Sequence, residues 1–188
     1  QPDFKEYFIT FNEDYHGKTH GALSFTDSEN FASGFHTGIP KENVIFLEPG
    51  NIEALKNAIQ IKTFGKNKNS IAGVIMEPIQ GQTLQIHPEG YLNEATILCK
   101  ENDILILMDE IKVGMGRTGK LFSFFEEKLV PDILTISKAL GGGKRAIGVM
   151  VTSSKLSKKA YGKRKDSALH STTFGGLGES CAVAIETL

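Results

Sequence analysis

The sequence has 188 residues, 40% of them hydrophobic, with 21 Lys and Arg against 22 Asp and Glu. This near-neutral balance argues against nucleic acid or an acidic membrane surface as the partner, and the sequence has no apolar run as long as a membrane span. The composition is typical of a soluble globular chain of one domain or slightly more. Because the chain starts with Gln1 and not Met, we expect a fragment or a processed product.

The cysteines and histidines give little sign of a metal or a disulfide. Cys99 and Cys181 both lie in apolar helical patterns, which favours two buried thiols in a reducing compartment, and we therefore expect a cytoplasmic protein. His16 and His20 have the spacing of a zinc-binding helix, but Gly17 lies between them and no acidic base follows. We expect no metal site.

Six runs with the character of β-strands recur along the chain, and helical periodicity separates several of them. The strand-like runs are residues 6–11, 43–47, 71–77, 104–110, 132–137 and 147–153. Helical patterns cover residues 51–61, with Asn51 as a plausible N-cap, and residues 90–102, and a further helix starts within residues 176–188. Strands that alternate with helices predict an α/β fold with a mainly parallel sheet and right-handed crossovers.

Two polar stretches are expected to be surface structure. Residues 61–70 are loop-like and favour a surface connection. Residues 155–165 carry six basic residues, but Tyr161 is the only aromatic among them. A solvated helix face followed by a loop therefore fits this stretch better than a nucleic-acid site.

Two of the apolar runs end on residues that can carry chemistry together. Residues 104–108 lead into Asp109, and residues 132–137 lead into Lys138. Short continuous apolar runs are typical of buried parallel strands, whose carboxyl ends border ligand crevices, so both residues should face one crevice. A carboxylate can hold a pyridinium nitrogen protonated, and a lysine amine can form a Schiff base with an aldehyde. Taken singly, each residue is equally compatible with a charged surface position.

Motifs along nearly the whole chain resemble the class III aminotransferases in sequence, order and spacing. They are VIMEPIQGQ (74–82), PEGYL (88–92), LMDEIKVGMGRTGKLF (107–122), PDILTISKALGGG (131–143) and HSTTFGG (170–176). YHGKTHGALS (15–24) and GNIEAL (50–55) look most like the putrescine (diamine) and ornithine branch.

The resemblance implies a pyridoxal phosphate (PLP) transferase of fold type I, with a mainly parallel sheet and helices on both faces. Residues 1–188 would form most of the PLP-binding large domain, without an N-terminal segment and the C-terminal small domain. The family would act as a homodimer with active sites at the interface. Its members move an amino group from an ω-amine, diamine or amino acid to a 2-oxo acid by a ping-pong mechanism. Amination of an aldehyde or semialdehyde, and a catalytically silent PLP-binding protein, are the alternatives.

The resemblance also assigns roles to individual residues. Lys138 matches the lysine of the Schiff base, and Asp109 matches the partner of the pyridine nitrogen. The remaining cofactor contacts implied are Tyr15, which stacks on the ring, His16 beside it, Ile111 on the opposite ring face, Lys112, and Thr173, which reaches a phosphate oxygen across the dimer interface.

Two positions depart from the family pattern. Lys112 stands where Gln commonly donates to the cofactor's phenolic oxygen, so it would add a full charge beside a phenolate. Gln82 stands where the ornithine branch has a carboxylate that pairs with a gating arginine, which makes switching by that pair doubtful.

A dinucleotide site is the main alternative from another class. Gly114, Gly116 and Gly119 satisfy G-x-G-x-x-G after a strand. In that fingerprint the glycine turn follows the strand directly and opens a helix, whereas residues 109–113 intervene here.

Overall fold

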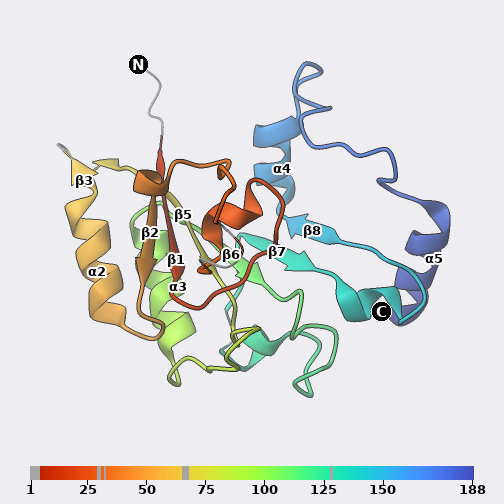
Figure 1. The fold of residues 1–188 in the computed structure, drawn as a ribbon, viewed down its shortest axis with the longest axis horizontal. Helices are drawn as coiled ribbons and strands as arrows, with labels where there is room; N and C mark the ends of the chain where they lie inside the picture. The colour runs from red at the N-terminus through yellow and green to blue at the C-terminus, as the bar shows by residue number, and fades with distance from the viewer. Residues whose placement is uncertain (1–4, 29–30, 32, 65–67, 128) are drawn as a thin grey trace.

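A six-stranded sheet organises the chain, with strand order β2-β1-β5-β6-β7-β8 (Figure 1). The computed structural model describes residues 5–28, 31, 33–64, 68–127 and 129–188. Neighbouring strands run parallel except β8, which pairs antiparallel with β7 at the sheet edge. The strands of this sheet are β1 Tyr7–Phe11, β2 Val44–Leu47, β5 Ile71–Met76, β6 Leu105–Asp109, β7 Ile133–Ile136 and β8 Val149–Thr152. The predicted α/β class and mainly parallel sheet are confirmed, and each strand lies within its predicted run.

The helices form where the periodicity predicted them. They are α2 Ile52–Ile61, α3 Tyr91–Glu101, α4 Ser154–Tyr161 and α5 Gly178–Thr187, with 3-10 turns at η1 Ala22–Phe25, η2 Lys41–Asn43, η3 Ser123–Glu127 and η4 Lys138–Gly141. The expected loop at 61–70 differs slightly, because β3 (Thr63–Phe64) and β4 (Lys68–Asn69) form a short antiparallel pair there.

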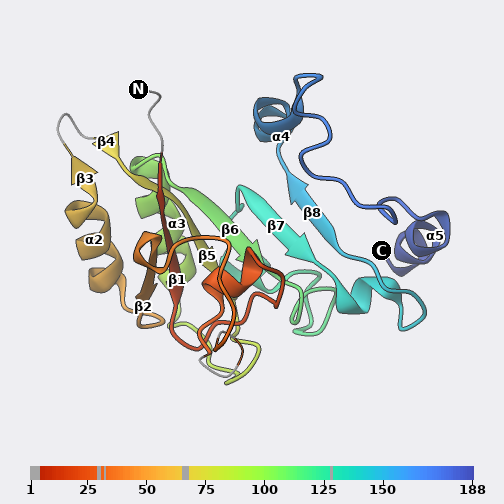
Figure 2. The same ribbon diagram turned by 45° about the horizontal axis from the view of Figure 1, so that its top comes forward.

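The alternation of side chains along the central strands gives the sheet two different faces. Ile9, Phe11, Val74 and Met76 belong to the main hydrophobic core together with Leu55, Ala95 and Cys99 of α2 and α3. Phe8 and Ile75, one residue out of phase, pack instead with Phe25 and Val44 in a smaller cluster. One face is thus covered by α2 and α3, and the other by residues 12–28 and 33–40, which include η1 (Figures 1 and 2).

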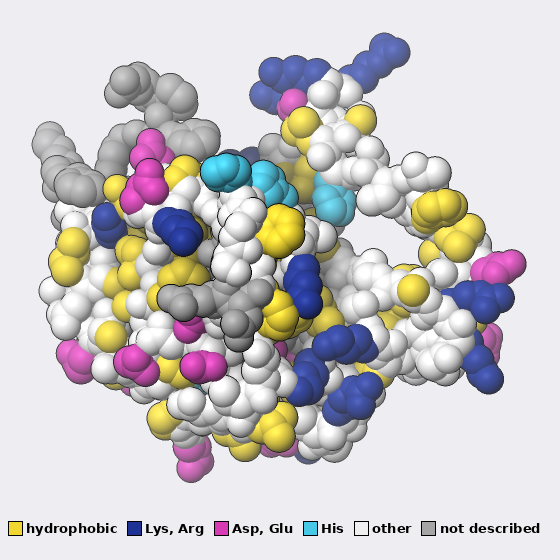
Figure 3. Space-filling view, viewed as in Figure 1, with side chains coloured by type: hydrophobic (Ala, Val, Ile, Leu, Met, Phe, Trp, Pro, Cys, Tyr) yellow, Lys and Arg dark blue, Asp and Glu magenta, His cyan; other side chains and the backbone are white. Residues whose placement is uncertain are grey.

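The sheet edge formed by β8 is open. Val149, Met150 and Val151 are all exposed in the single chain, although they are apolar. Beyond β8, the lysines of α4 are exposed, and Lys and Arg side chains gather at the tip of the loop that follows it (Figure 3). This is the solvated helix face and loop that the basic stretch predicted. None of the helices in the described ranges combines the length and apolar character of a membrane span.

Asn51 begins α2 as predicted: its Oδ1 accepts a hydrogen bond of 3.0 Å from the backbone N–H of Ala54. Replacing a side chain in this capping position by Ala costs about 1 kcal/mol, because a helical N–H loses its acceptor. We expect Asn51→Ala to speed amide hydrogen exchange of residues 52–61 roughly fivefold, measured by mass spectrometry on the full-length protein. Asn57→Ala, an exposed position of the same helix, is the matched control and should not speed it. Equal exchange rates in Asn51→Ala and the unmodified protein would contradict the capping role.

Candidate active site

The candidate site lies where the carboxyl ends of four parallel strands meet. β5 and β6 pair Met76 with Met108, and β6 and β7 pair Asp109 with Thr135, so these strands end almost level. Glu77 follows β5, Asp109 closes β6, and Lys138 follows β7. The residues after β1, including Tyr15 and His16, turn back over the same edge. Parallel strands thus bring these residues together, as the sequence predicted for Asp109 and Lys138.

A pocket of about 360 Å³ opens at this edge. Its lining combines six of the seven residues singled out from the sequence with five others: Tyr15, His16, Gly17, Phe31, Glu77, Gly81, Gln82, Asp109, Ile111, Lys112 and Lys138. The rings of Tyr15 and Phe31 meet edge to face, 5.7 Å apart between centroids. The pocket therefore combines an aromatic wall, an aliphatic side chain, two carboxyl groups and two lysines.

Asp109 is held firmly at this pocket. Its Oδ1 accepts from its neighbour Ile111 N–H at 3.0 Å, and its Oδ2 lies 2.8 Å from His16 Nδ1. Asp109 is only 6% exposed, so both contacts form in a largely dry environment. A carboxylate fixed in this way is oriented before any ligand arrives.

His16 is buried beside two carboxylates. Its Nδ1 faces Asp109, and its Nε2 lies 3.5 Å from Asp14 Oδ2. Burial alone would lower the pKa of His16, but the hydrogen bonds and negative charges of Asp109 and Asp14 outweigh it and raise that pKa to about 9. His16 therefore carries a positive charge at neutral pH.

Glu77 ties two loops of the pocket together. Its Oε1 accepts from Tyr15 N–H at 2.8 Å, and its Oε2 accepts from Gly81 N–H at 2.9 Å. Burial raises the pKa of Glu77 to about 7, with Asp14 and Asp109 adding to the rise while the Tyr15 hydrogen bond and His16 oppose it. A Cβ at Gly81 would lie 2.7 Å from Glu77 Oε2, so this close approach needs glycine.

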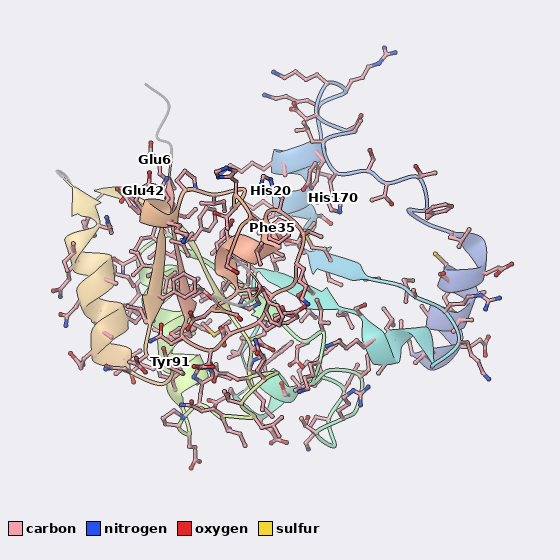
Figure 4. The ribbon with its side chains drawn as sticks, in the orientation of Figure 1. Glu6, His20, Phe35, Glu42, Tyr91 and His170 are labelled. Carbon is pink, nitrogen blue, oxygen red and sulfur yellow. The ribbon has the colours of Figure 1, made fainter. Side chains whose placement is uncertain are left out.

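Glu77 is also supported from the core side. His87 Nε2 lies 3.1 Å from the carbonyl oxygen of Glu77. The His87 ring stacks on Tyr91, with centroids 4.9 Å apart. Tyr91 lies at the start of α3, as labelled in Figure 4. The end of β5 is thereby fixed to the helix layer beneath the sheet.

Lys112 contributes its side chain to the same wall. It is half-buried, and its Nζ donates a hydrogen bond to the carbonyl oxygen of Gly81. The ammonium thus stays at the pocket, next to the turn that Glu77 holds. Whether it also reaches a cofactor oxygen stays a prediction.

Lys138 begins η4 directly at the pocket mouth. Its backbone φ is +47°, in the left-handed region that residues with a Cβ rarely adopt. Its neighbours hold it there: Ser137 Oγ donates to Ile147 carbonyl oxygen at 2.6 Å, and Leu140 is buried. Backbone strain of this kind concentrates at functional sites, where the surrounding structure maintains it.

Thr173 lies apart from the other six predicted residues. It is exposed, and it does not line their pocket. Its neighbours Thr172 and Phe174 line a second cavity of about 840 Å³ that Lys138 also borders. Since the resemblance assigns Thr173 to a partner's active site, its role stays a prediction.

Sequence reasoning missed two buried residues of the site, Glu77 and Asp14. Glu77 directly follows the apolar run of β5, as Asp109 closes the run of β6, so the same strand-end signal was present. Asp14 stands immediately before Tyr15, and nothing in its own sequence context marks it as buried.

The glycine motif at residues 114–119 is not followed by the α-helix that a dinucleotide site requires. Residues 111–122 form turns and bends, and the next helical element is η3, a 3-10 turn of 5 residues. A dinucleotide fingerprint needs an α-helix whose N-terminus meets the pyrophosphate. The three glycines instead shape the loop that carries Lys112 and leads back to the core.

Comparisons with known proteins agree on one family. The family model described as aminotransferase class-III matches residues 1–188. The ornithine aminotransferase of Toxoplasma gondii, with PLP at partial occupancy in its active site in one structure, is 29% identical with a TM-score of 0.85, over 100% of this chain and 41% of that one. An (S)-enantioselective ω-transaminase of Thermomicrobium roseum is 26% identical with a TM-score of 0.87, over 100% and 44%. A transaminase of Virgibacillus is 25% identical with a TM-score of 0.85, over 99% and 42%. The chain therefore spans about two fifths of the length of these proteins.

The charge on His16 predicts a pH dependence of stability. Its folded pKa of about 9 lies above the ordinary 6.5, so the stabilisation is complete below pH 6.5 and is lost as the pH rises through 9. The full effect is on the order of 3 kcal/mol. We expect the melting temperature of the cofactor-free protein to fall between about pH 7 and 10, and that of His16→Gln to fall much less. The exposed His20→Gln is the control and should follow the unmodified protein. Parallel curves for all three proteins would rule out a buried charged His16.

Proposed function

The chain belongs to the class III aminotransferase family, and from that premise we propose that the protein is a PLP-dependent aminotransferase. It transfers an amino group from an ω-amine, a diamine or an amino acid to a 2-oxo acid in a ping-pong reaction. The observation that carries this proposal is the convergence of Tyr15, His16, Asp109, Ile111, Lys112 and Lys138, from three separate stretches of sequence, on one pocket. Residues 1–188 would be most of the domain that binds the cofactor.

The residues present fit this cofactor. Asp109 offers a buried carboxylate, already oriented by Ile111 N–H and His16, to a protonated ring nitrogen. Tyr15 and Ile111 line the same pocket and are suited to enclose a flat ring between an aromatic and an aliphatic side chain. When bound, PLP supplies an electron-accepting ring that stabilises the negative charge left when the substrate's amine-bearing carbon loses a proton.

Asp109 and Lys138 would carry the chemistry at this ring. The Asp109 carboxylate keeps the ring nitrogen protonated, because a negative charge at hydrogen-bond distance favours the cationic form. The Lys138 amine would hold the cofactor through its aldehyde, and its Nζ, when free, would move a proton to and from the reacting carbon. Its place at the strand end and the glycines 141–143 behind it leave room for this exchange.

The other pocket residues position these two groups. His16 holds Asp109, Glu77 fixes the backbone of Tyr15 and Gly81, and Lys112 is anchored to the same turn. Gln82, exposed at the pocket rim, is neutral where the ornithine branch has a carboxylate. Because Gln82 cannot form an ion pair with an arginine, this position supports an amino donor such as an ω-amine or diamine, whose binding does not require that pair to open.

We further propose a homodimer with Thr173 of each subunit reaching the partner's active site. The exposure of Thr173 and the open edge at β8 are compatible with this assembly. The buried free thiol of Cys99 and the half-buried one of Cys181 fit the reducing environment of a cytoplasm.

The direct test is the attachment of the cofactor to Lys138. The full-length protein is loaded with PLP and reduced with borohydride, and its peptides are analysed by mass spectrometry. We expect the cofactor-derived mass on Lys138 and its loss in Lys138→Ala, with turnover reduced roughly a thousandfold or more. Lys144→Ala, an exposed position nearby, should keep both the adduct and the turnover. A label on Lys112 or Lys144 would overturn the assignment, and a trapped adduct without any transamination would identify a silent binding protein.

A second prediction concerns the charge of Asp109. Asp109→Asn should still bind PLP but lower turnover about a hundredfold or more, because a neutral amide cannot keep the ring nitrogen protonated. The matched control is Asp103→Asn, in which the exposed Asp103 loses its ion pair with Lys5 before β6, away from the pocket. Stopped-flow rates of the half-reaction with amine distinguish the two variants. A wild-type rate in Asp109→Asn would show that Asp109 has another role.

A further inference from the structure

A chain of three buried side chains extends from the pocket into the protein. Asp109 lies at the pocket, His16 behind it, and Asp14 beyond His16. Asp14 is fully buried, with 0% exposure, and it takes no part in the roles assigned so far. A buried carboxylate costs stability unless other groups satisfy it, so its position behind His16 calls for an explanation.

The contacts of Asp14 are satisfied on one side only. Its Oδ1 accepts from Gln80 Nε2 at 2.9 Å, and Gln80 is itself fixed by a 2.7 Å hydrogen bond to the Asn12 carbonyl oxygen. Among the described residues, its Oδ2 meets no donor other than His16 Nε2, which lies 3.5 Å away at the limit of a hydrogen bond. This second oxygen is thus directed at the imidazole.

The groups around the ring fix the protonation state of His16 by geometry. Nδ1 faces the carboxylate of Asp109 at 2.8 Å. Nε2 faces Asp14 Oδ2 and, at 3.3 Å, Thr10 Oγ1. Thr10 Oγ1 also lies 3.4 Å from the Phe25 carbonyl oxygen, to which it can donate, and its oxygen is then free to accept from the ring. Both ring nitrogens therefore face acceptors, and only the doubly protonated imidazolium can donate to both.

We propose that Asp14 is a positioning residue that holds His16 as an imidazolium from the far side of the ring and thereby keeps Asp109 fixed and negatively charged toward the pocket. Without Asp14, a charged His16 would cancel the charge of Asp109. With Asp14, the Asp14–His16 pair is neutral and the charge of Asp109 remains available to a cationic ligand. The inference rests on the proposed function only for the identity of that ligand, the ring of the cofactor.

Among the described residues, the other charged groups that line the same pocket as His16 and Asp109 are Glu77 and two lysines. Glu77 interacts with His16 through space, and it titrates at about pH 7, below the range of His16. Lys112 and Lys138 line the same pocket but do not contribute to the shift of the His16 pKa, which comes from Asp109 and Asp14. A titration above neutrality therefore reports on the chain Asp14–His16–Asp109.

The experiment is an NMR titration of the histidine ring signals in the cofactor-free full-length protein. Residues 1–188 contain five histidines, each of which gives ring signals, and the signal that disappears in His16→Gln is that of His16. We expect a pKa near 9 in the unmodified protein and a decrease of about one unit or more in Asp14→Asn, whose amide turns a donor toward Nε2. Asp27→Asn removes a charge from the same loop, where Asp27 Oδ2 accepts from Glu13 N–H, and it should leave the pKa of His16 unchanged.

Three results would overturn the proposal: a pKa of His16 at or below its ordinary 6.5 in the unmodified protein, an unchanged pKa in Asp14→Asn, or an equal decrease in Asp27→Asn. The first needs no variant, so it decides against the proposal even where Asp14→Asn does not fold. In the loaded protein, Asp14→Asn should move the step that His16 contributes to the pH profile of turnover toward lower pH. Because the NMR titration uses no cofactor, its outcome is independent of whether the protein proves to be an aminotransferase.

Discussion

The parallel register of β1, β5, β6 and β7 is the constraint on which the site depends. Parallel strands present all their carboxyl ends at one edge, and here the β5, β6 and β7 ends are almost level. Residues far apart in the sequence, such as His16 and Asp109, become hydrogen-bonded neighbours only because of this register. A shift of one residue in β6 would turn Asp109 to the opposite face of the sheet and away from the pocket.

The second determinant of the site is the concentration of carboxylates at a nearly dry edge. Asp14, Glu77 and Asp109 are all buried, and a single imidazole lies among them. The protein stabilises this arrangement with directed donors, namely Gln80 for Asp14 and the backbone N–H groups of Tyr15 and Gly81 for Glu77. The carboxylates around His16 keep the imidazole charged, and Asp109 presents its negative charge to a cationic group in the pocket.

The sheet and helices could be predicted from the sequence, because each element has a strong local signal: apolar runs for the strands, and an Asn51 cap with helical periodicity for α2. The prediction that Asp109 and Lys138 border one pocket followed from a general rule, because the carboxyl ends of parallel strands meet at one edge of the sheet. Glu77 carries the same strand-end signal, whereas the role of Asp14 could not be predicted in this way, because its burial is produced by contacts with residues more than sixty positions away, such as Gln80. The direction of Lys112 depends likewise on the Gly81 turn, which no local pattern encodes.

The left-handed backbone at Lys138 has a consequence for attempts to stabilise the protein. A glycine would adopt a φ of +47° with almost no cost, whereas an L-residue with a Cβ pays about 1 kcal/mol there. Selection for thermal stability alone would thus favour replacing the one amine on which the proposed chemistry depends. At residue 138 stability favours glycine, whereas the proposed reaction requires the lysine amine. Stability-guided redesign of the chain should therefore keep Lys138 unchanged.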